Sequence, residues 1–252
     1  MPCLVGVSHY AGWMPGLYKD EGVVLSTIKL GEADRILTIF TRDNGKVRAV
    51  AKGVRKTKSR WGGRLEPFTR VDLLVYRGRN LDTITAADII EAHPGLRTDY
   101  VKLTSAAALA ELVDKISPDR ERSGATYDLL LAGLAAIHDG KGTSVVPAFL
   151  VKLLSLSGFH PSLQVCAGCG DTRALEAFSP AMGGVVCLGC WEEDGSAMRL
   201  GADRILLMAR MLSLDFGSPA DEEAVVDVTN SLRRYAEYHI ERPLRSLQLL
   251  AI

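Results

Sequence analysis

The sequence has no long apolar segment. In its 252 residues, no apolar run approaches the ~18 to 20 residues of a membrane-spanning helix. Residues 1–18 contain no Lys, Arg, Asp or Glu, so they lack the basic start of a secretory signal, and Pro and Gly interrupt their apolar residues. These absences predict a protein with no membrane partner.

Residues 1–17 also lack the periodicity of a helix or a strand. We predict that they form a disordered extension, and Met14 is a candidate for the true start because a structured pattern begins soon after it. The alternative is an ordered N-terminal arm.

Common catalytic signatures are missing as well. The chain has no G-x-x-x-x-G-K-[ST] loop, which predicts that it binds no nucleotide such as ATP. Its five histidines are scattered, and none of them has a recognisable triad context with Ser or Cys.

The chain has no net charge, but this zero is a cancellation. Residues 19–99 carry 16 Lys and Arg against 11 Asp and Glu, whereas residues 100–252 carry 14 against 19. Within residues 42–79 the count is 12 against 3, an excess of +9. A polyanion is attracted by the local charge and not by the net charge of the chain, so this basic segment is a candidate binding site for a polyanion.

Residues 18–95 consist mainly of short segments with strand character. They are rich in β-branched residues or alternate between polar and apolar ones, at residues 22–28, 35–41, 46–52, 69–76 and 81–86. Asp43-Asn44-Gly45 predicts a hairpin, because Asn and Gly tolerate positive φ. Five short strands without crossover helices predict a small closed barrel of the OB-fold type, although an SH3-like barrel would give much the same pattern.

From Tyr100 onward the apolar period becomes helical. Leu109, Leu112, Val113 and Ile116 show the i, i+3, i+4, i+7 spacing, and a last long helix is expected at about residues 222–240. A Gly-rich stretch at about residues 162–196 interrupts this pattern. We therefore predict an α+β protein: a five-stranded OB-fold barrel at residues 18–95, then an α-helical domain at residues 96–252 with an inserted element.

Four of the five cysteines lie in this inserted element. Cys166, Cys169, Cys187 and Cys190 form two C-x2-C pairs that are separated by 17 residues, within the range of four-cysteine zinc sites. Two such pairs supply four thiolates and leave no open position, so we predict one structural Zn²⁺ per chain. Two disulfides, a redox C-x-x-C pair or an iron–sulfur cluster are the alternatives.

The basic segment predicts a surface for nucleic acid. Flexible cations beside an aromatic ring suit a single strand, because the cations follow the phosphates while the ring of Trp61 stacks on a base. A solvated run of charge is the alternative, and the low aromatic content of 6 % predicts weak sequence preference. The candidate residues are Arg35, Lys46, Arg48, Lys52, Arg55, Lys56, Lys58, Arg60, Trp61 and Arg64.

Segments along most of the chain resemble the RecO family of bacterial DNA repair proteins. They are residues 20–25, 30–36, 45–55, 65–68, 158–161 with the first C-x2-C pair, and 238–247. The resemblance implies a cytoplasmic mediator of recombination that joins the nucleoid during repair. It implies binding to single- and double-stranded DNA and annealing of complementary strands. It also implies work with RecR and single-strand-binding protein to help load RecA.

A zinc-dependent nucleic-acid-processing enzyme is the alternative function. A zinc deaminase would show H-x-E followed by P-C-x-x-C. Neither C-x-x-C pair here follows a proline, and the one H-x-E, at residues 239–241, comes after both pairs. We therefore expect a protein that is not an enzyme.

The N-terminal extension gives a first testable prediction. Deleting residues 1–13 should leave the melting temperature and the affinity for DNA unchanged, because the segment carries no charge and no periodic pattern. Thermal unfolding and a gel-shift titration of the shortened chain check this. A large loss in either measurement would show that the segment is an ordered arm.

Overall fold

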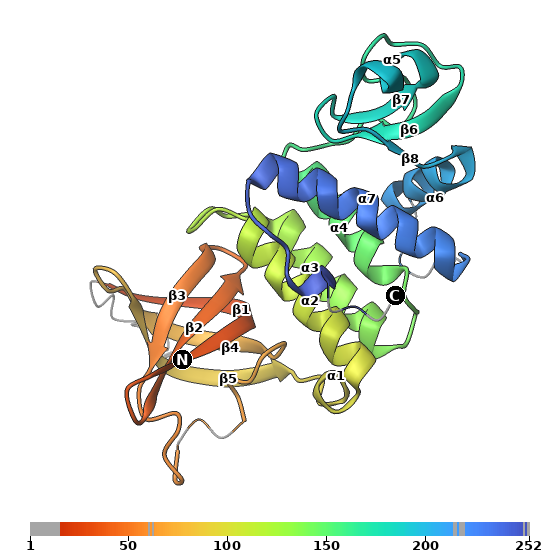
Figure 1. The fold of residues 1–252 in the computed structure, drawn as a ribbon. Helices are drawn as coiled ribbons and strands as arrows, with labels where there is room; N and C mark the ends of the chain where they lie inside the picture. The colour runs from red at the N-terminus through yellow and green to blue at the C-terminus, as the bar shows by residue number, and fades with distance from the viewer. Residues whose placement is uncertain are drawn as a thin grey trace, which may run out of the picture.

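The computed structural model describes residues 16–59, 61, 63–213, 216, 220–248 and 250. A β-barrel at the N-terminal side packs against a bundle of helices, and a small three-stranded sheet lies at the side of the bundle away from the barrel (Figure 1). Within these residues, no helix is both long and apolar enough to cross a membrane.

The barrel closes in the order β1-β2-β3-β5-β4. Its strands are β1 (Leu17–Leu30), β2 (Asp34–Thr41), β3 (Gly45–Ala51), β4 (Arg70–Tyr76) and β5 (Asp82–Glu91). The long β1 pairs with β4 through its first half and with β2 through its second, and β3 pairs with β5 in parallel. This arrangement confirms the OB-type barrel.

The first and the last strand of the barrel are longer than the sequence predicted. β1 begins at Leu17, inside the predicted extension, because this residue pairs with Tyr76 of β4. β5 continues to Glu91, beyond the expected end at residue 86. Of the predicted extension, residues 1–15 lie outside the described residues.

Most helices of the bundle bury their apolar faces against one central helix, and the short first helix packs against the two that follow it. The helices are α1 (Gly95–Thr98), α2 (Tyr100–Ile116), α3 (Gly124–His138), α4 (Val145–Leu156), α6 (Ala202–Ser213) and α7 (Glu222–Ile240), with a 3₁₀ turn, η1 (Ser246–Gln248). α4 contacts α2, α3, α6 and α7 and is buried along most of its length. The side chains of Asp99, Ser123 and Asp221 cap α2, α3 and α7 by accepting backbone N–H bonds.

The cysteine-bearing element is a small sheet in the order β7-β6-β8. It contains β6 (Leu175–Ser179), β7 (Gly184–Cys187), the short helix α5 (Leu188–Glu193) and β8 (Met198–Arg199). The ring of Phe178 in β6 lies 5.4 Å from that of Tyr235 in α7, which joins the element to the bundle. Strands of two to five residues are too short to show a period, so the sequence predicted only an interruption here.

The connection between α2 and α3 binds the barrel to the bundle. Lys46, at the start of β3, is only 5 % exposed, and its ammonium lies 3.6 Å from Asp114 Oδ1 and 3.2 Å from Asp119 Oδ1. Its Nζ also donates to the carbonyl oxygen of Asp114, and its own carbonyl accepts from Arg120 N at 2.9 Å. A buried ammonium needs such partners, and here the helical domain supplies them.

Asp82 forms a second charged contact at this junction. Its carboxylate is fully buried and accepts hydrogen bonds from Arg120 Nη2 at 2.8 Å, Tyr18 Oη at 2.7 Å and Gly78 N at 3.0 Å. Burial alone would raise the pKa of Asp82, but the bonds from Arg120 and Tyr18 lower it below its ordinary value.

Gly45 allows the barrel and the α2–α3 connection to approach closely. It has φ of +63°, and a Cβ at this position would overlap the backbone of Glu121. Gly53 has φ of +71°, but a Cβ there would meet nothing closer than Lys56 Cδ at 3.6 Å. The two glycines therefore share one backbone conformation and differ in their surroundings.

This difference gives a second prediction. Gly53→Ala should lower the free energy of unfolding by roughly 1–2 kcal/mol, the cost of left-handed backbone for alanine. Gly45→Ala should lower it by the same amount and by a further ~1–3 kcal/mol from the overlap with Glu121. Urea unfolding of both variants measures this, and equal decreases would contradict the close approach.

Candidate nucleic-acid interface and metal centre

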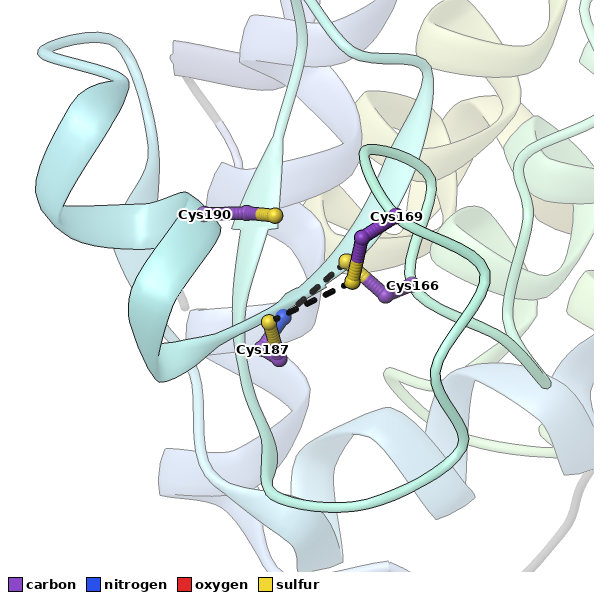
Figure 2. A group of neighbouring side chains, drawn as sticks. All are labelled: Cys166, Cys169, Cys187 and Cys190. Carbon is purple, nitrogen blue, oxygen red and sulfur yellow. Dashed lines mark hydrogen bonds between the residues drawn. The ribbon is translucent and has the colours of Figure 1, made fainter.

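The four clustered cysteines come from two turns that face each other. Cys166 and Cys169 lie in the loop before β6, whereas Cys187 ends β7 and Cys190 lies in the first turn of α5. Figure 2 shows their sulfurs converging on a common centre, and all four Sγ atoms lie within 4.8 Å of one another. The structure thus brings together the complete predicted ligand set.

The spacing of the sulfurs fits a tetrahedral metal ion. Ligands at about 2.3 Å from a central ion are about 3.8 Å apart in a regular tetrahedron. The Sγ atoms of Cys169 and Cys187 are 3.8 Å apart, and the four described cysteines form no disulfide. A Cβ on Gly168 would lie 2.9 Å from the Cys190 sulfur, so this tight turn needs glycine.

The backbone of the two turns stabilises negative charge on the buried sulfur. Burial alone would raise the pKa of the Cys166 thiol, but N–H groups of Cys187, Cys169 and Gly168 lower it to about 6. The bond from Cys187 N is 3.3 Å long. Hydrogen bonds with the other three thiols, Cys166 first, raise the pKa of Cys190 to about 12. Four neighbouring thiols cannot all ionise alone, and a bound dication would stabilise all four thiolates.

Several cations of the basic segment are paired within the protein. Arg42 lies 2.6 Å from Glu21, and Arg70 lies 2.9 Å from the same carboxylate. Of the predicted DNA-binding residues, Arg35 lies 3.5 Å from Glu66 and Arg64 lies 3.8 Å from Asp88. The excess of +9 therefore overstates the charge available to a ligand.

Two predicted DNA-binding residues are buried instead of exposed. Lys46 faces Asp114 and Asp119 at the junction, so its charge serves the contact between the domains. Trp61 is 2 % exposed in the core of the barrel, where its Nε1 donates to the carbonyl of Lys52 at 2.8 Å. Its ring cannot stack on a base from this position. Arg60 lies outside the described residues.

The remaining predicted cations form one exposed set. Arg48 projects from β3, since its neighbours Val47 and Ala49 face the core, and Lys52, Arg55, Lys56 and Lys58 follow in the loop after this strand. None of the five has an ion-pair partner among the described residues. We call these five residues the loop cations.

The loop that carries these cations is held at its base. Gly53 N donates to Asp34 Oδ1 at 2.8 Å, and Arg55 N donates to the carbonyl of Ala33 at 2.9 Å. The guanidinium of Arg55 also donates to the carbonyl of Gly31 at 3.1 Å. The turn between β1 and β2 thus positions the loop part of this set, from Lys52 to Lys58, at one end of the barrel.

The sequence did not single out two other exposed or half-exposed cations. Lys115 of α2 and Arg242 after α7 line a cleft of about 490 Å³ together with Arg48. They belong to no local run of charge, so only the folded chain brings them together. Arg242 does lie in the segment 238–247 that resembles the RecO family.

Comparison with known proteins now identifies the family. A model described as Recombination protein O N terminal matches residues 14–93, and one described as Recombination protein O C terminal matches residues 97–248. The chain belongs to the RecO family. The two matched regions meet where β5 ends and α1 begins, so they correspond to the barrel and the helical domain.

Curated relatives support the same assignment. The DNA repair protein RecO of Bifidobacterium adolescentis is 41% identical over 245 residues, which cover 93% of this chain and 99% of that protein. The proteins of the same name from a Nocardioides species and from Thermobifida fusca are 41% and 38% identical, and each match covers 98% of the relative. The family that the sequence predicted is therefore confirmed.

The metal centre gives a third prediction. Purified protein should contain about one metal ion per chain, because the four sulfurs form one closed set. Cys169→Ser should lower both the metal content and the melting temperature, since metal binding is coupled to folding. Elemental analysis and thermal unfolding measure these effects. Cys3→Ser, at the fifth cysteine, is the matched control and should change neither. A protein with no metal and with all five thiols titratable would contradict the site.

Proposed function

We propose that this RecO family member binds single- and double-stranded DNA through the loop cations and anneals complementary strands during recombinational DNA repair. The exposure of these cations without acidic partners is the observation that carries the proposal. An OB-type barrel commonly binds oligonucleotides on its strand 2–3 face and its loops, and Arg48 lies on β3. The name of the curated relatives agrees with a role in repair.

Annealing requires a protein to offset the repulsion between two phosphate backbones. Cations on a barrel surface and a loop neutralise phosphates and leave the base edges free to pair. Trp61 is buried, so the loop cations offer charge without an adjacent stacking ring. Binding of this kind depends little on sequence. Because the chain has no nucleotide-binding loop, we propose annealing without ATP.

For the metal centre we propose structural Zn²⁺. Within the described ranges, the donor cluster consists of four cysteines, with no His or carboxylate among its members. Four thiolates fill a tetrahedron, whereas a catalytic zinc keeps one position for water. This donor set favours a protein that is not an enzyme over a zinc-dependent nucleic-acid-processing enzyme. The four residues would hold the turn of the loop against β7 and α5.

We also propose that the protein acts with partners in the bacterial cytoplasm, at the nucleoid during repair. RecR, single-strand-binding protein and RecA are the partners that the family resemblance implies. A protein that neutralises phosphates but uses no nucleotide cannot by itself drive a filament onto DNA. It can prepare the strand for a partner that loads RecA.

The loop cations give a fourth prediction. The double variant Arg55→Glu and Lys56→Glu should weaken binding to all DNA sequences alike and slow annealing. Removing one cation–phosphate interaction should flatten the slope of log K against log salt by about 0.7 for single strands, so we expect a decrease of roughly one to two units. Fluorescence anisotropy over a salt series and an annealing assay without ATP or added metal measure this.

A matched control distinguishes an effect of the loop position from an effect of the change in net charge. Lys141→Glu with Arg199→Glu makes the same charge change at exposed positions elsewhere, after α3 and on β8. This control should keep the salt slope, and both double variants should keep the melting temperature, since exposed charges contribute little to folding. A loop variant with an unchanged slope, or annealing that stops without ATP, would show that the proposal is wrong.

A further inference from the structure

The cleft of about 490 Å³ lies where the barrel meets the helical domain. Its walls include β3, the end of α2 with the following connection, and the residues around the end of α7. α7 ends at Ile240, and Glu241 takes a left-handed conformation with φ of +53°, which turns the chain there. Arg242, the next residue, lines the cleft.

The charges that line this cleft favour an anion. Four cations and two carboxylates lie on its walls: Lys46, Arg48, Lys115 and Arg242, and Asp114 and Asp119. Both carboxylates lie within 4.0 Å of the Lys46 ammonium, so they are already engaged. No described residue forms an ion pair with Arg48, Lys115 or Arg242. Three cations therefore remain against the one carboxylate charge that Lys46 does not balance, and four cations minus two carboxylates leave the cleft a net charge of +2.

β3 connects this cleft to the loop cations. Residues of even number in β3 face away from the barrel core, so Arg48 shares one side of the strand with Lys46, and Lys52 follows directly after the last strand residue, Ala51. A strand rises by about 3.3 Å per residue, which places Lys46 and Arg48 about 7 Å apart along this side. A polyanion bound at the loop can thus pass Arg48 and reach the cleft, without crossing a different face of the barrel.

Two of these three cations lie at the C-terminal end of a helix. Lys115 lies in the last turn of α2, where a positive charge is favourable without any ligand. Arg242 lies beyond the end of α7, on exposed chain, and Arg48 lies on a strand. Arg48 gains nothing from a helix dipole, whereas Arg242 follows Ile240 by two residues and is favoured by the C-terminal end of α7. Arg242 is exposed and Lys115 is half-buried, so Arg242 is the residue to substitute.

We propose that the helical domain completes the nucleic-acid path, with Arg242 and Lys115 binding the phosphodiester backbone of a single strand that leaves the loop cations along β3. This inference rests on the proposed function and adds a second phosphate-binding segment to it. The barrel holds one stretch of the strand, and the cleft holds the next. Binding at two segments of one strand keeps it extended along β3 and presents its bases to a complementary strand.

The test compares four proteins on one probe, an oligo(dT) strand, by fluorescence anisotropy over a salt series. They are the full-length wild type, Arg242→Glu, Arg242→Lys and Lys141→Glu. Arg242→Glu should weaken binding several-fold at low salt and flatten the slope of log K against log salt by about 0.7. Arg242→Lys should keep the wild-type slope, because it retains the charge. Lys141→Glu is the control. Lys141 follows the C-terminal end of α3, whereas the N-terminal end of this helix is the one next to the junction.

Combination with the loop variant separates the two proposals. If the cleft and the loop bind one strand independently, the change in slope from Arg242→Glu should add to that from Arg55→Glu with Lys56→Glu. If Arg242→Glu behaves like Lys141→Glu while the loop variant shows a flatter slope, the cleft inference is overturned and the proposed function stands. If neither variant changes the slope, both are overturned. A matching melting temperature for all variants shows that each protein is folded.

Discussion

The burial of charge at the junction of the two domains determines how the rest of the molecule is arranged. The ammonium of Lys46 and the carboxylate of Asp82 are buried on the barrel, and each has its counter-ion on the chain around the α2–α3 connection. A buried charge without such a partner costs several kcal/mol, so this connection stabilises the barrel. The same interaction holds the start of β3 against the end of α2, and both of these line the cleft.

Pairing within the protein also decides which cations are left for a ligand. Arg42 and Arg70 share Glu21, and Lys46 is held by Asp114 and Asp119. Among the described cations that the sequence predicted to bind DNA, those without an ion-pair partner lie on β3, at Arg48, and in the loop after it. A uniformly positive surface would bind a polyanion in many registers. Because several cations are paired within the protein, the proposed binding path is limited to β3 and the loop after it. The chain thus uses a single basic segment both for its own cohesion and for an external surface.

Local patterns were sufficient to predict much of this structure. The Asp43-Asn44-Gly45 turn, the helix at residues 222–240 and the cluster of four cysteines depend on short spacings that can be read from the sequence. The burial of Trp61 depends on packing with distant strands. The burial of the Lys46 ammonium depends on carboxylates from the helical domain. The strands β6 to β8 are too short for a period. Interactions of this kind arise only when the whole chain has folded.

The buried indole of Trp61 has a consequence for the energetics of association. Its hydrogen bond to Lys52 and the bond from Gly53 to Asp34 hold both ends of the segment that contains Arg55, Lys56 and Lys58. A short segment with fixed ends has few backbone conformations to lose. A polyanion that binds these side chains therefore orders side chains rather than main chain, and the entropic cost of the encounter is small. Capture of a strand at this end of the barrel does not have to wait for a loop to fold.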